Sequence, residues 1–130
     1  MKEILIALAM LTTLPAVAAE SPLLSDLRAA ARQENPSFKE FSAARGESFY
    51  NAKQGDIGCT SCHTASPKNA GKHAKTGKEI LPLAPSVNAE RFTDAAKVEK
   101  WFKRNCNEVL QRACTAQEKG DFIAYVQSVK

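Results

Sequence analysis

The sequence feature that most constrains this chain is the string Cys59-Thr60-Ser61-Cys62-His63, which has the pattern C-x-x-C-H. Two thiols at this spacing can form thioether bonds to the vinyl groups of a porphyrin, and the imidazole that follows can bind its iron. The string therefore predicts one covalently attached c-type haem, with His63 as the proximal iron ligand. A zinc site would need two further ligands at finger-like spacing, and a thioredoxin-like site would need a βαβ context. The sequence offers neither.

The first residues have the layout of a secretory signal peptide. Lys2 precedes an apolar run over residues 4–17, and small residues lead up to Glu20. The run is shorter than the roughly 18 to 20 apolar residues that a membrane-spanning helix needs. We therefore expect a signal peptide at residues 1–19, a single domain at residues 20–130, export to the periplasm, and no stable membrane insertion after cleavage.

The composition of the chain excludes some partners. Its 130 residues suit one compact domain, and 18 Lys and Arg against 14 Asp and Glu give a formal net charge of +4. Because Lys2 and Glu3 cancel, the domain after residue 19 has the same charge. This mild basicity, without aromatic residues interleaved among the basic ones, is not typical of a nucleic-acid binder.

Apolar residues recur at helical spacing in four segments, and no segment shows the alternation of a convincing strand. The helices are expected from Ser21 to about Asn35, from Ser37 to about Tyr50, from Asp94 to about Leu110, and from Thr115 to the C-terminus. Ser37 with Glu40, and Thr115 with Glu118, have the spacing of a capping box. Residues 55–85 show no periodicity. An irregular stretch of this length is unusual in a compact domain, but it is accounted for if the stretch packs on a haem. The sequence therefore predicts an all-α fold wrapped around one haem.

Cys106 and Cys114 are the cysteines that the haem motif leaves over. In an oxidising compartment such a pair is expected to form a disulfide. A continuous helix would hold the two Cα atoms about 12 Å apart, whereas a disulfide tolerates up to about 7 Å. The pairing therefore requires the third helix to end near Gln111, and the capping box at Thr115 independently indicates the same break.

The second axial ligand of the iron decides what such a protein can do. Small electron-transfer cytochromes often use methionine there, but the methionines of this chain are Met1 and Met10, both in the signal segment. Methionine ligation is therefore excluded. His73 is the only other histidine, and ligation by it would give a bis-histidine electron carrier. It can equally be a surface residue, since it stands among lysines at 68, 72, 75 and 78. These lysines are either a docking face for an acidic partner or a solvated loop.

Asn105 is the other candidate ligand. It falls near Trp101, Phe102 and Val109 on the apolar face of the third helix, where a buried amide needs hydrogen-bond partners. It could bond to backbone near the helix end, or it could face the iron. An amide is a weak, hard ligand that prefers ferric to ferrous iron. Reduction would then release Asn105 and open a site for oxygen, nitric oxide or another diatomic molecule.

Several short motifs are shared with one family of cytochromes: Arg45-Gly46-Glu47, Cys59 to His63, Thr76-Gly77-Lys78-Glu79-Ile80, Leu83-Ala84-Pro85-Ser86, Arg91-Phe92-Thr93-Asp94, Val98-Glu99-Lys100-Trp101, and Arg104-Asn105-Cys106-Asn107 with Cys114. The last motif is much less common among cytochromes c than the others. Over most of the expected domain the chain resembles the sphaeroides haem protein family, which are c-type cytochromes related in fold to class I cytochromes c.

The resemblance implies a ligand set and a function. In that family the asparagine immediately before the first disulfide cysteine is the distal ligand, which by position is Asn105, with Cys106 and Cys114 as the disulfide. The iron of the family loses this asparagine on reduction and binds oxygen or nitric oxide, and a dihaem cytochrome c is the implied redox partner. A bis-histidine electron carrier that uses His73 remains an alternative. So does a small oxygen or nitric oxide reductase, although no second titratable group is apparent for proton delivery.

Overall fold

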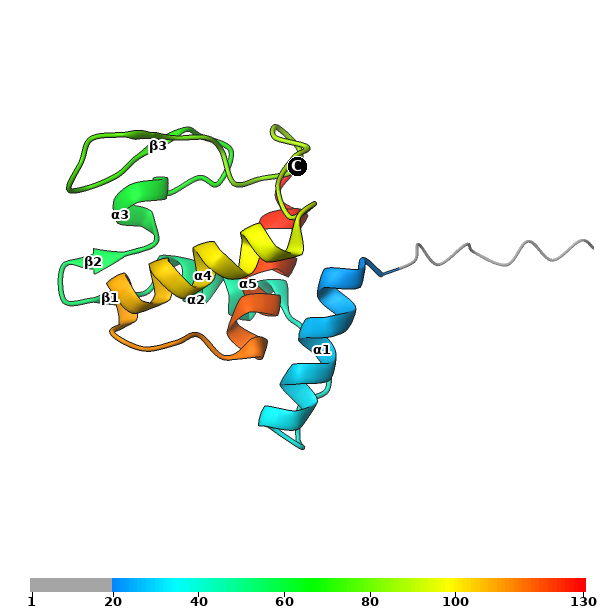
Figure 1. The fold of residues 1–130 in the computed structure, drawn as a ribbon. Helices are drawn as coiled ribbons and strands as arrows, with labels where there is room; N and C mark the ends of the chain where they lie inside the picture. Colours follow the sequence, from blue (N-terminus) through cyan, green and yellow to red (C-terminus); the bar gives the residue numbers. More distant parts are fainter. Residues whose placement is uncertain (1–19) are drawn as a thin grey trace, which may run out of the picture.

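The computed structural model describes residues 20–130, where five α-helices and four two-residue strands alternate with loops (Figure 1). The elements are α1 (Pro22–Glu34), α2 (Ala43–Asn51), β1 (Lys53–Gln54), β2 (Ile57–Gly58), α3 (Thr60–His63), β3 (Gly71–Lys72), β4 (Glu79–Ile80), α4 (Ala95–Leu110) and α5 (Ala116–Ser128). The predicted helical fold is confirmed. The predicted signal peptide, residues 1–19, lies outside the described residues. Within them, no helix combines the length and apolar character needed to cross a membrane.

Three of the four predicted helix starts are confirmed, because a polar side chain caps each one. The Oγ atom of Ser21 accepts a hydrogen bond from the Leu24 N–H at 3.4 Å, and Asp94 starts α4 in the same way. Thr115 and Glu118 form both bonds of the predicted capping box. Such caps satisfy N–H groups that the first turn of a helix leaves without a partner.

The second helix starts later than predicted. Ser37 and Glu40 do not form a capping box; α2 begins directly after Ser42, whose side chain is the N-cap. The Ser37 N–H is donated instead to Oδ1 of Asn35 at 3.0 Å, in a turn of the kind that asparagine favours. The Ser42 N–H is held by Asp121 of α5 at 2.7 Å. The prediction is wrong because contacts with distant residues determine where α2 begins.

The expectation of no strands is also wrong in detail, since two minimal antiparallel pairs are present. β1 pairs with β2, and β3 pairs with β4. Between the strands of each pair stands a glycine with positive φ, Gly55 at 59° and Gly77 at 68°, a conformation that glycine adopts readily. Ladders this short depend on their turns and leave no alternating pattern in the sequence.

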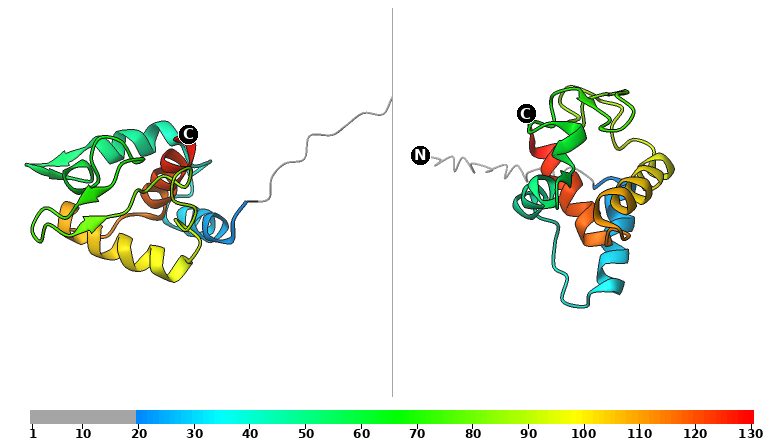
Figure 2. Two further views of the ribbon diagram at one scale, coloured as in Figure 1. Left: turned by 90° about the horizontal axis from the view of Figure 1, so that it is seen from above. Right: turned by 90° about the vertical axis from the view of Figure 1, so that its left-hand side faces the viewer.

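The core lies between α2 and α5, and α1 packs on the outer side of α5 (Figure 2). Gly46 allows the closest approach, because a Cβ atom there would overlap the backbone carbonyl of Asp121. Tyr50, Ile123 and Val126 are the largest fully buried side chains. Burying residues of this size supplies most of the free energy that stabilises such a core.

One buried carboxylate joins the start of α2 to the middle of α5. Asp121 is 4% exposed and accepts hydrogen bonds from Arg45 Nε at 2.7 Å, from Arg45 Nη2 at 2.9 Å and from the Ser42 N–H. A buried charge is tolerated when it is paired and fully hydrogen-bonded in this way. Asp121 therefore determines how α2 enters the core.

α4 is attached to the rest of the molecule mainly by side chains. The ring of Phe102 packs edge-on against Phe122 of α5, with 5.4 Å between the centroids. The helix ends at Leu110, followed by Gln111 in the left-handed conformation at φ 57°, as the sequence predicted. This turn brings Cys106 and Cys114 into a disulfide with Cα atoms 5.7 Å apart.

Candidate functional site

The haem motif forms the short helix α3. Cys59 stands at the N-cap position, and Cys62 and His63 occupy the end of the helix. Both thiols are half-buried and neither is in a disulfide. Residues separated by three positions on a helix lie on the same side, so the two sulfur atoms face the same way. The burial of Cys59 raises the pKa of its thiol.

Tyr50 holds the end of this short helix in place. Its hydroxyl group donates to the carbonyl oxygen of Thr64 at 2.7 Å and lies 3.1 Å from that of His63. Thr64 has φ 65°, which is costly for a β-branched residue. Since burial raises the pKa of Tyr50, the hydroxyl remains protonated and available as a donor. Tyr50 therefore fixes the backbone that carries His63.

His63 has the protonation state that a metal ligand needs. Burial lowers the pKa of its imidazole to about 4, and the positive charge of Arg91 adds to the shift. The ring is therefore neutral at physiological pH, which is the form that binds iron. Arg91 is itself engaged by the preceding loop, because its Nε donates to the carbonyl oxygen of Pro82 at 2.8 Å and its Nη2 donates to that of Leu81.

The segment from Gly71 to Ile80 forms a hairpin that covers one side of α3. Gly71 passes so close to the backbone carbonyl of Cys62 that a Cβ atom there would overlap it. Further on, the Ala74 N–H approaches Cys62 Sγ at 3.4 Å. We call residues 71–80 the flap. Figure 1 shows this hairpin, labelled at β3, above α3.

His73 stands in the turn of the flap and is only partly exposed. Its Nδ1 atom accepts hydrogen bonds from the N–H groups of Lys75 and Thr76, each at 3.3 Å. Its Nε2 atom lies 3.8 Å from Oε2 of Glu108 on α4. The structure therefore places both ring nitrogens against protein groups.

Asn105 lies on α4, directly before the disulfide cysteine Cys106. Its side chain is exposed, although the sequence suggested a buried amide. Among residues 20–130 the Asn105 amide makes no hydrogen bond. Asn107 on the same helix and Gln111, which directly follows it, behave differently, because each donates back to a carbonyl oxygen, at 2.7 and 3.0 Å respectively. Of the two alternatives for Asn105, a bond to backbone near the helix end is therefore not found in the described residues.

These residues fit a c-type haem. Two unpaired thiols on one side of a helix can form the thioethers, and the neutral imidazole of His63 follows them at the position of a proximal ligand. The backbone around them is fixed by Tyr50, the flap and the loop that Arg91 holds. A helical fold with this site defines the class of c-type cytochromes.

Comparison with known proteins gives the family. A family model described as a domain of unknown function, DUF1924, matches residues 36–126. Cytochrome c'' of Methylophilus methylotrophus is 46% identical over 101 residues, which are 74% of this chain and 70% of that protein. Cytochrome c-type protein SHP of Cereibacter sphaeroides is 56% identical over 68 residues, 52% of either chain. The chain belongs to this DUF1924 family of SHP-like c-type cytochromes.

Solved structures agree with this assignment. The crystal structure of oxidised cytochrome c'' from M. methylotrophus superposes with a TM-score of 0.74 at 42% identity, over 83% of this chain and 92% of that one. The structure of oxidised SHP, described as an oxygen-binding cytochrome c, superposes with a TM-score of 0.70 at 42% identity, over 80% and 91%. The cofactor of the family is haem c.

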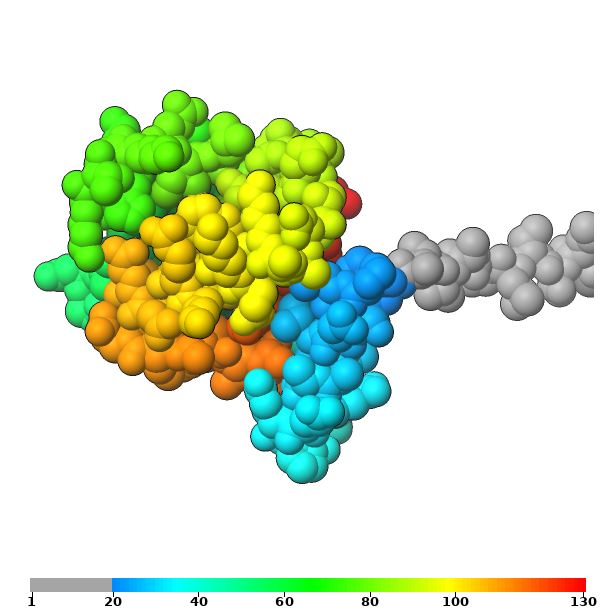
Figure 3. All heavy atoms as spheres, viewed as in Figure 1, coloured from blue at the N-terminus to red at the C-terminus, as the bar shows by residue number. Residues whose placement is uncertain are grey.

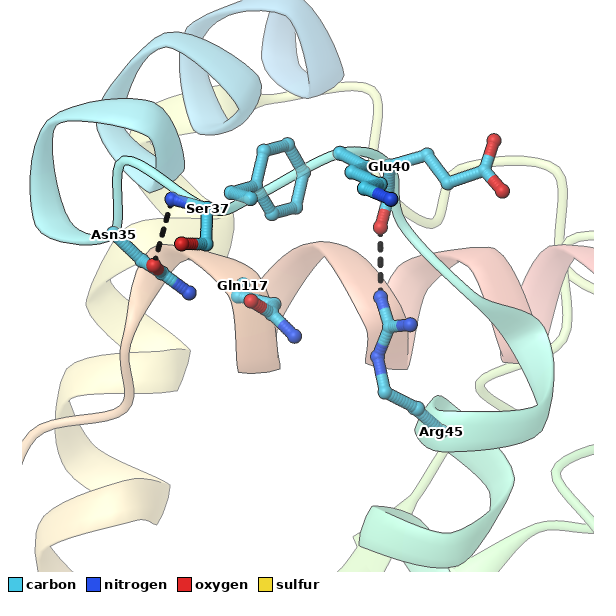
Figure 4. A pocket seen from close by; sticks show the side chains of 7 residues that line it. Asn35, Ser37, Glu40, Arg45 and Gln117 are labelled. Atoms are coloured by element: carbon cyan, nitrogen blue, oxygen red, sulfur yellow. Dashed lines mark hydrogen bonds between the residues drawn. The ribbon is translucent and has the colours of Figure 1, made fainter.

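A separate hollow elsewhere on the surface does not contribute to this site. Figure 4 shows it between the turn after α1 and the starts of α2 and α5, lined by Asn35, Ser37, Phe38, Lys39, Glu40, Arg45 and Gln117. The guanidinium group of Arg45 is already committed there, to the carbonyl oxygen of Glu40 at 2.7 Å and to Asp121. The hollow therefore presents mainly groups that support the fold.

Sequence reasoning missed three residues that shape the site. Tyr50 was expected only as the end of a helix, and Arg91 only as part of a family motif. Glu108, which faces the flap, was not noticed. The signal for Tyr50 in the sequence was a tyrosine in the last turn of the second helix. A buried tyrosine usually finds a hydrogen-bond partner for its hydroxyl group.

Proposed function

We propose that this protein is an exported monohaem cytochrome in which Asn105 is a displaceable distal ligand, so that the reduced protein binds a diatomic gas. The observation that carries this proposal is the state of Asn105. Its amide is exposed and makes no hydrogen bond among the described residues, while the Asn107 amide on the same helix donates to the carbonyl oxygen of Lys103. An amide without another role is available to a metal.

Each residue of the site has a role in this proposal. Cys59 and Cys62 hold the porphyrin through thioethers, and His63 supplies the proximal nitrogen. When bound, the haem supplies an iron that changes between ferric and ferrous states and accepts a small ligand. Tyr50 and the flap keep the segment that carries His63 in position.

Asn105 provides the selectivity between the two oxidation states. Its amide oxygen is a hard, weak donor, which suits ferric iron better than the softer ferrous ion. We therefore expect Asn105 to dissociate from the iron when the iron is reduced. Its NH₂ group would then be free to donate a hydrogen bond to an incoming ligand. The disulfide at Cys106 would hold the backbone next to Asn105 in place in either state.

The relatives support the proposal that a displaceable Asn105 serves the binding of a gas. SHP is described as an oxygen-binding cytochrome c, and the solution structure of cytochrome c'' concerns detachment of a haem ligand. We extend both properties to this chain, with oxygen and nitric oxide as the ligands. We also include electron exchange with a dihaem cytochrome c in the periplasm, for which the lysines of the flap offer a positively charged docking face.

Substitution of the two candidate ligands tests the proposal. We expect Asn105→Ala to change the ferric absorption spectrum, and to bind an external ligand such as imidazole at least about tenfold more tightly, because nothing has to be displaced. His73→Ala is the matched control and should leave the ferric spectrum as it is. The reduced wild-type protein should take up carbon monoxide.

Two results would count against this function. A ferric spectrum that is unchanged in Asn105→Ala and altered in His73→Ala would favour the bis-histidine electron carrier. A reduced wild-type protein that stays low-spin and ignores carbon monoxide would exclude a displaceable ligand altogether.

A further inference from the structure

The flap touches both sides of the proposed haem site. At one end Gly71 and Ala74 contact Cys62 of the haem motif. At its turn, Lys75 Nζ lies 3.1 Å from Glu108 Oε1, and His73 Nε2 lies 3.8 Å from Glu108 Oε2. Figure 3 shows atoms of the flap meeting the C-terminal part of α4 at the edge of the molecule. The flap therefore spans from the attachment helix to the helix that carries Asn105.

Glu108 occupies a particular place on α4. It follows Asn105 by three residues, so the two side chains lie on adjacent turns of the same side of the helix. Its side chain is only 33% exposed, it pairs with Lys75 at 3.1 Å, and the positive charge of Arg104 also acts on its carboxyl. The flap residues that contact Glu108 are therefore held on the side of α4 that carries Asn105.

α4 itself does not depend on Glu108. On its other flank it is fixed by the Cys106 disulfide, by Phe102 against Phe122, and by the ion pair between Glu99 and Lys119 at 2.8 Å. These contacts remain when Glu108 is changed. Loss of the Glu108 charge should therefore release the flap and leave the helix where it is.

The flap has little else to keep it closed at its turn. Its ladder is two residues long, and its turn is held by short backbone hydrogen bonds, from His73 N–H to Lys78 and from Gly77 N–H to His73, each at 2.8 Å. Isolated hairpins of this length are at best marginally stable, and such segments open locally at low free-energy cost. In residues 20–130, the Lys75 ion pair and the approach of the His73 ring to α4 both end on Glu108.

We propose that Glu108 is a positioning residue that latches the flap to α4 beside Asn105, and that release of this latch admits a small ligand to the position Asn105 leaves. The latch acts on entry of the ligand, whereas Asn105 acts on the iron. This inference rests on the proposed function, because a ligand must enter for the latch to matter.

The test compares Glu108→Gln with Glu99→Gln in the holoprotein. Both substitutions remove one charge of α4 that is paired with a lysine, but only Glu108 faces the flap. We expect Glu108→Gln to raise hydrogen exchange of residues 71–80, and the association rate of carbon monoxide with the reduced protein, by about two- to fivefold. That is the population change expected from loss of a partly exposed ion-pair cluster. Glu99→Gln should change neither.

A charge swap shows whether the ion pair itself is responsible. Lys75→Glu and Glu108→Lys alone should each open the flap, and the double variant should restore slow exchange and slow association. A Glu108→Gln protein that matches Glu99→Gln in both measurements overturns the latch, as does faster flap exchange without faster association. Failure of the proposed function is seen separately, as an unchanged ferric spectrum in Asn105→Ala.

Discussion

Tyr50 has the largest structural role of any single residue near the haem motif. Its ring is fully buried between Phe122 and Tyr125, with centroids 6.0 and 5.5 Å away, and its hydroxyl group bonds to the backbone after α3. One side chain therefore connects the helical core to the segment that carries His63. Movement of the core would be transmitted directly to the backbone at His63.

Replacing Tyr50 with Phe tests this connection. The ring is retained, but the carbonyl oxygens of His63 and Thr64 lose their donor, and we expect the free energy of unfolding to fall by about 1 to 2 kcal/mol. Chemical denaturation of the holoprotein measures the change. Tyr125→Phe is the matched control, since it removes a hydroxyl that makes no hydrogen bond within residues 20–130, and it should cost less than about 0.5 kcal/mol. Equal effects of the two variants would show that the hydrogen bonds from Tyr50 to the His63 and Thr64 carbonyl oxygens do not add to the free energy of unfolding.

The start of α5 is an element whose stability depends on pH. Arg112, which donates to Glu118 at 2.6 and 2.8 Å, holds the pKa of Glu118 below the ordinary value of 4.5. The lowered pKa means that the folded protein favours the carboxylate. The resulting stabilisation is present above pH 4.5 and is lost as the pH falls through the lowered value.

Glu118→Gln isolates this charge, because glutamine can still accept the Thr115 N–H bond of the capping box. Arg112 is half exposed, so solvent weakens the pair, and we expect the variant to be less stable by about 0.5 kcal/mol at pH 7. The difference should shrink as the pH falls below 4.5 and disappear once the pH is below the lowered pKa of Glu118. Urea denaturation of both proteins across this range measures it, and a difference that does not change with pH would contradict the assignment.

The disulfide joins α4 to the loop that leads into α5, and it is the second feature that acts at the scale of one element. It closes a short loop, with a sequence separation of 8, and the chain-entropy estimate for a loop of this size is about 2.5 kcal/mol. We expect the double variant Cys106→Ala and Cys114→Ala to be less stable by about that amount. A mild reductant should lower the stability of the wild-type protein towards that of the variant and leave the variant unchanged. If reductant affected both proteins equally, the stabilisation would have another source.

At the scale of the whole molecule, the features that could be predicted are those with a local cause. The caps at Ser21, Asp94 and Thr115 act within one turn, and the haem motif occupies neighbouring positions, so both are visible in sequence. The start of α2 was missed because Asp121, far along the chain, holds Ser42. The role of Glu108 was missed for the same reason, since its partners are in the flap. No spacing rule relates such pairs.

The bonds from Asp121 to Arg45 and Ser42 join residues separated by 76 and 79 positions. Bringing such distant segments together has an entropy cost that no early contact offsets, and folds that depend on non-local contacts form slowly. The helix pair at the centre of this molecule therefore closes a large ring of chain that contains the haem motif, the flap and α4. Its folding rate should be set by that closure, and far less by how fast the individual helices form.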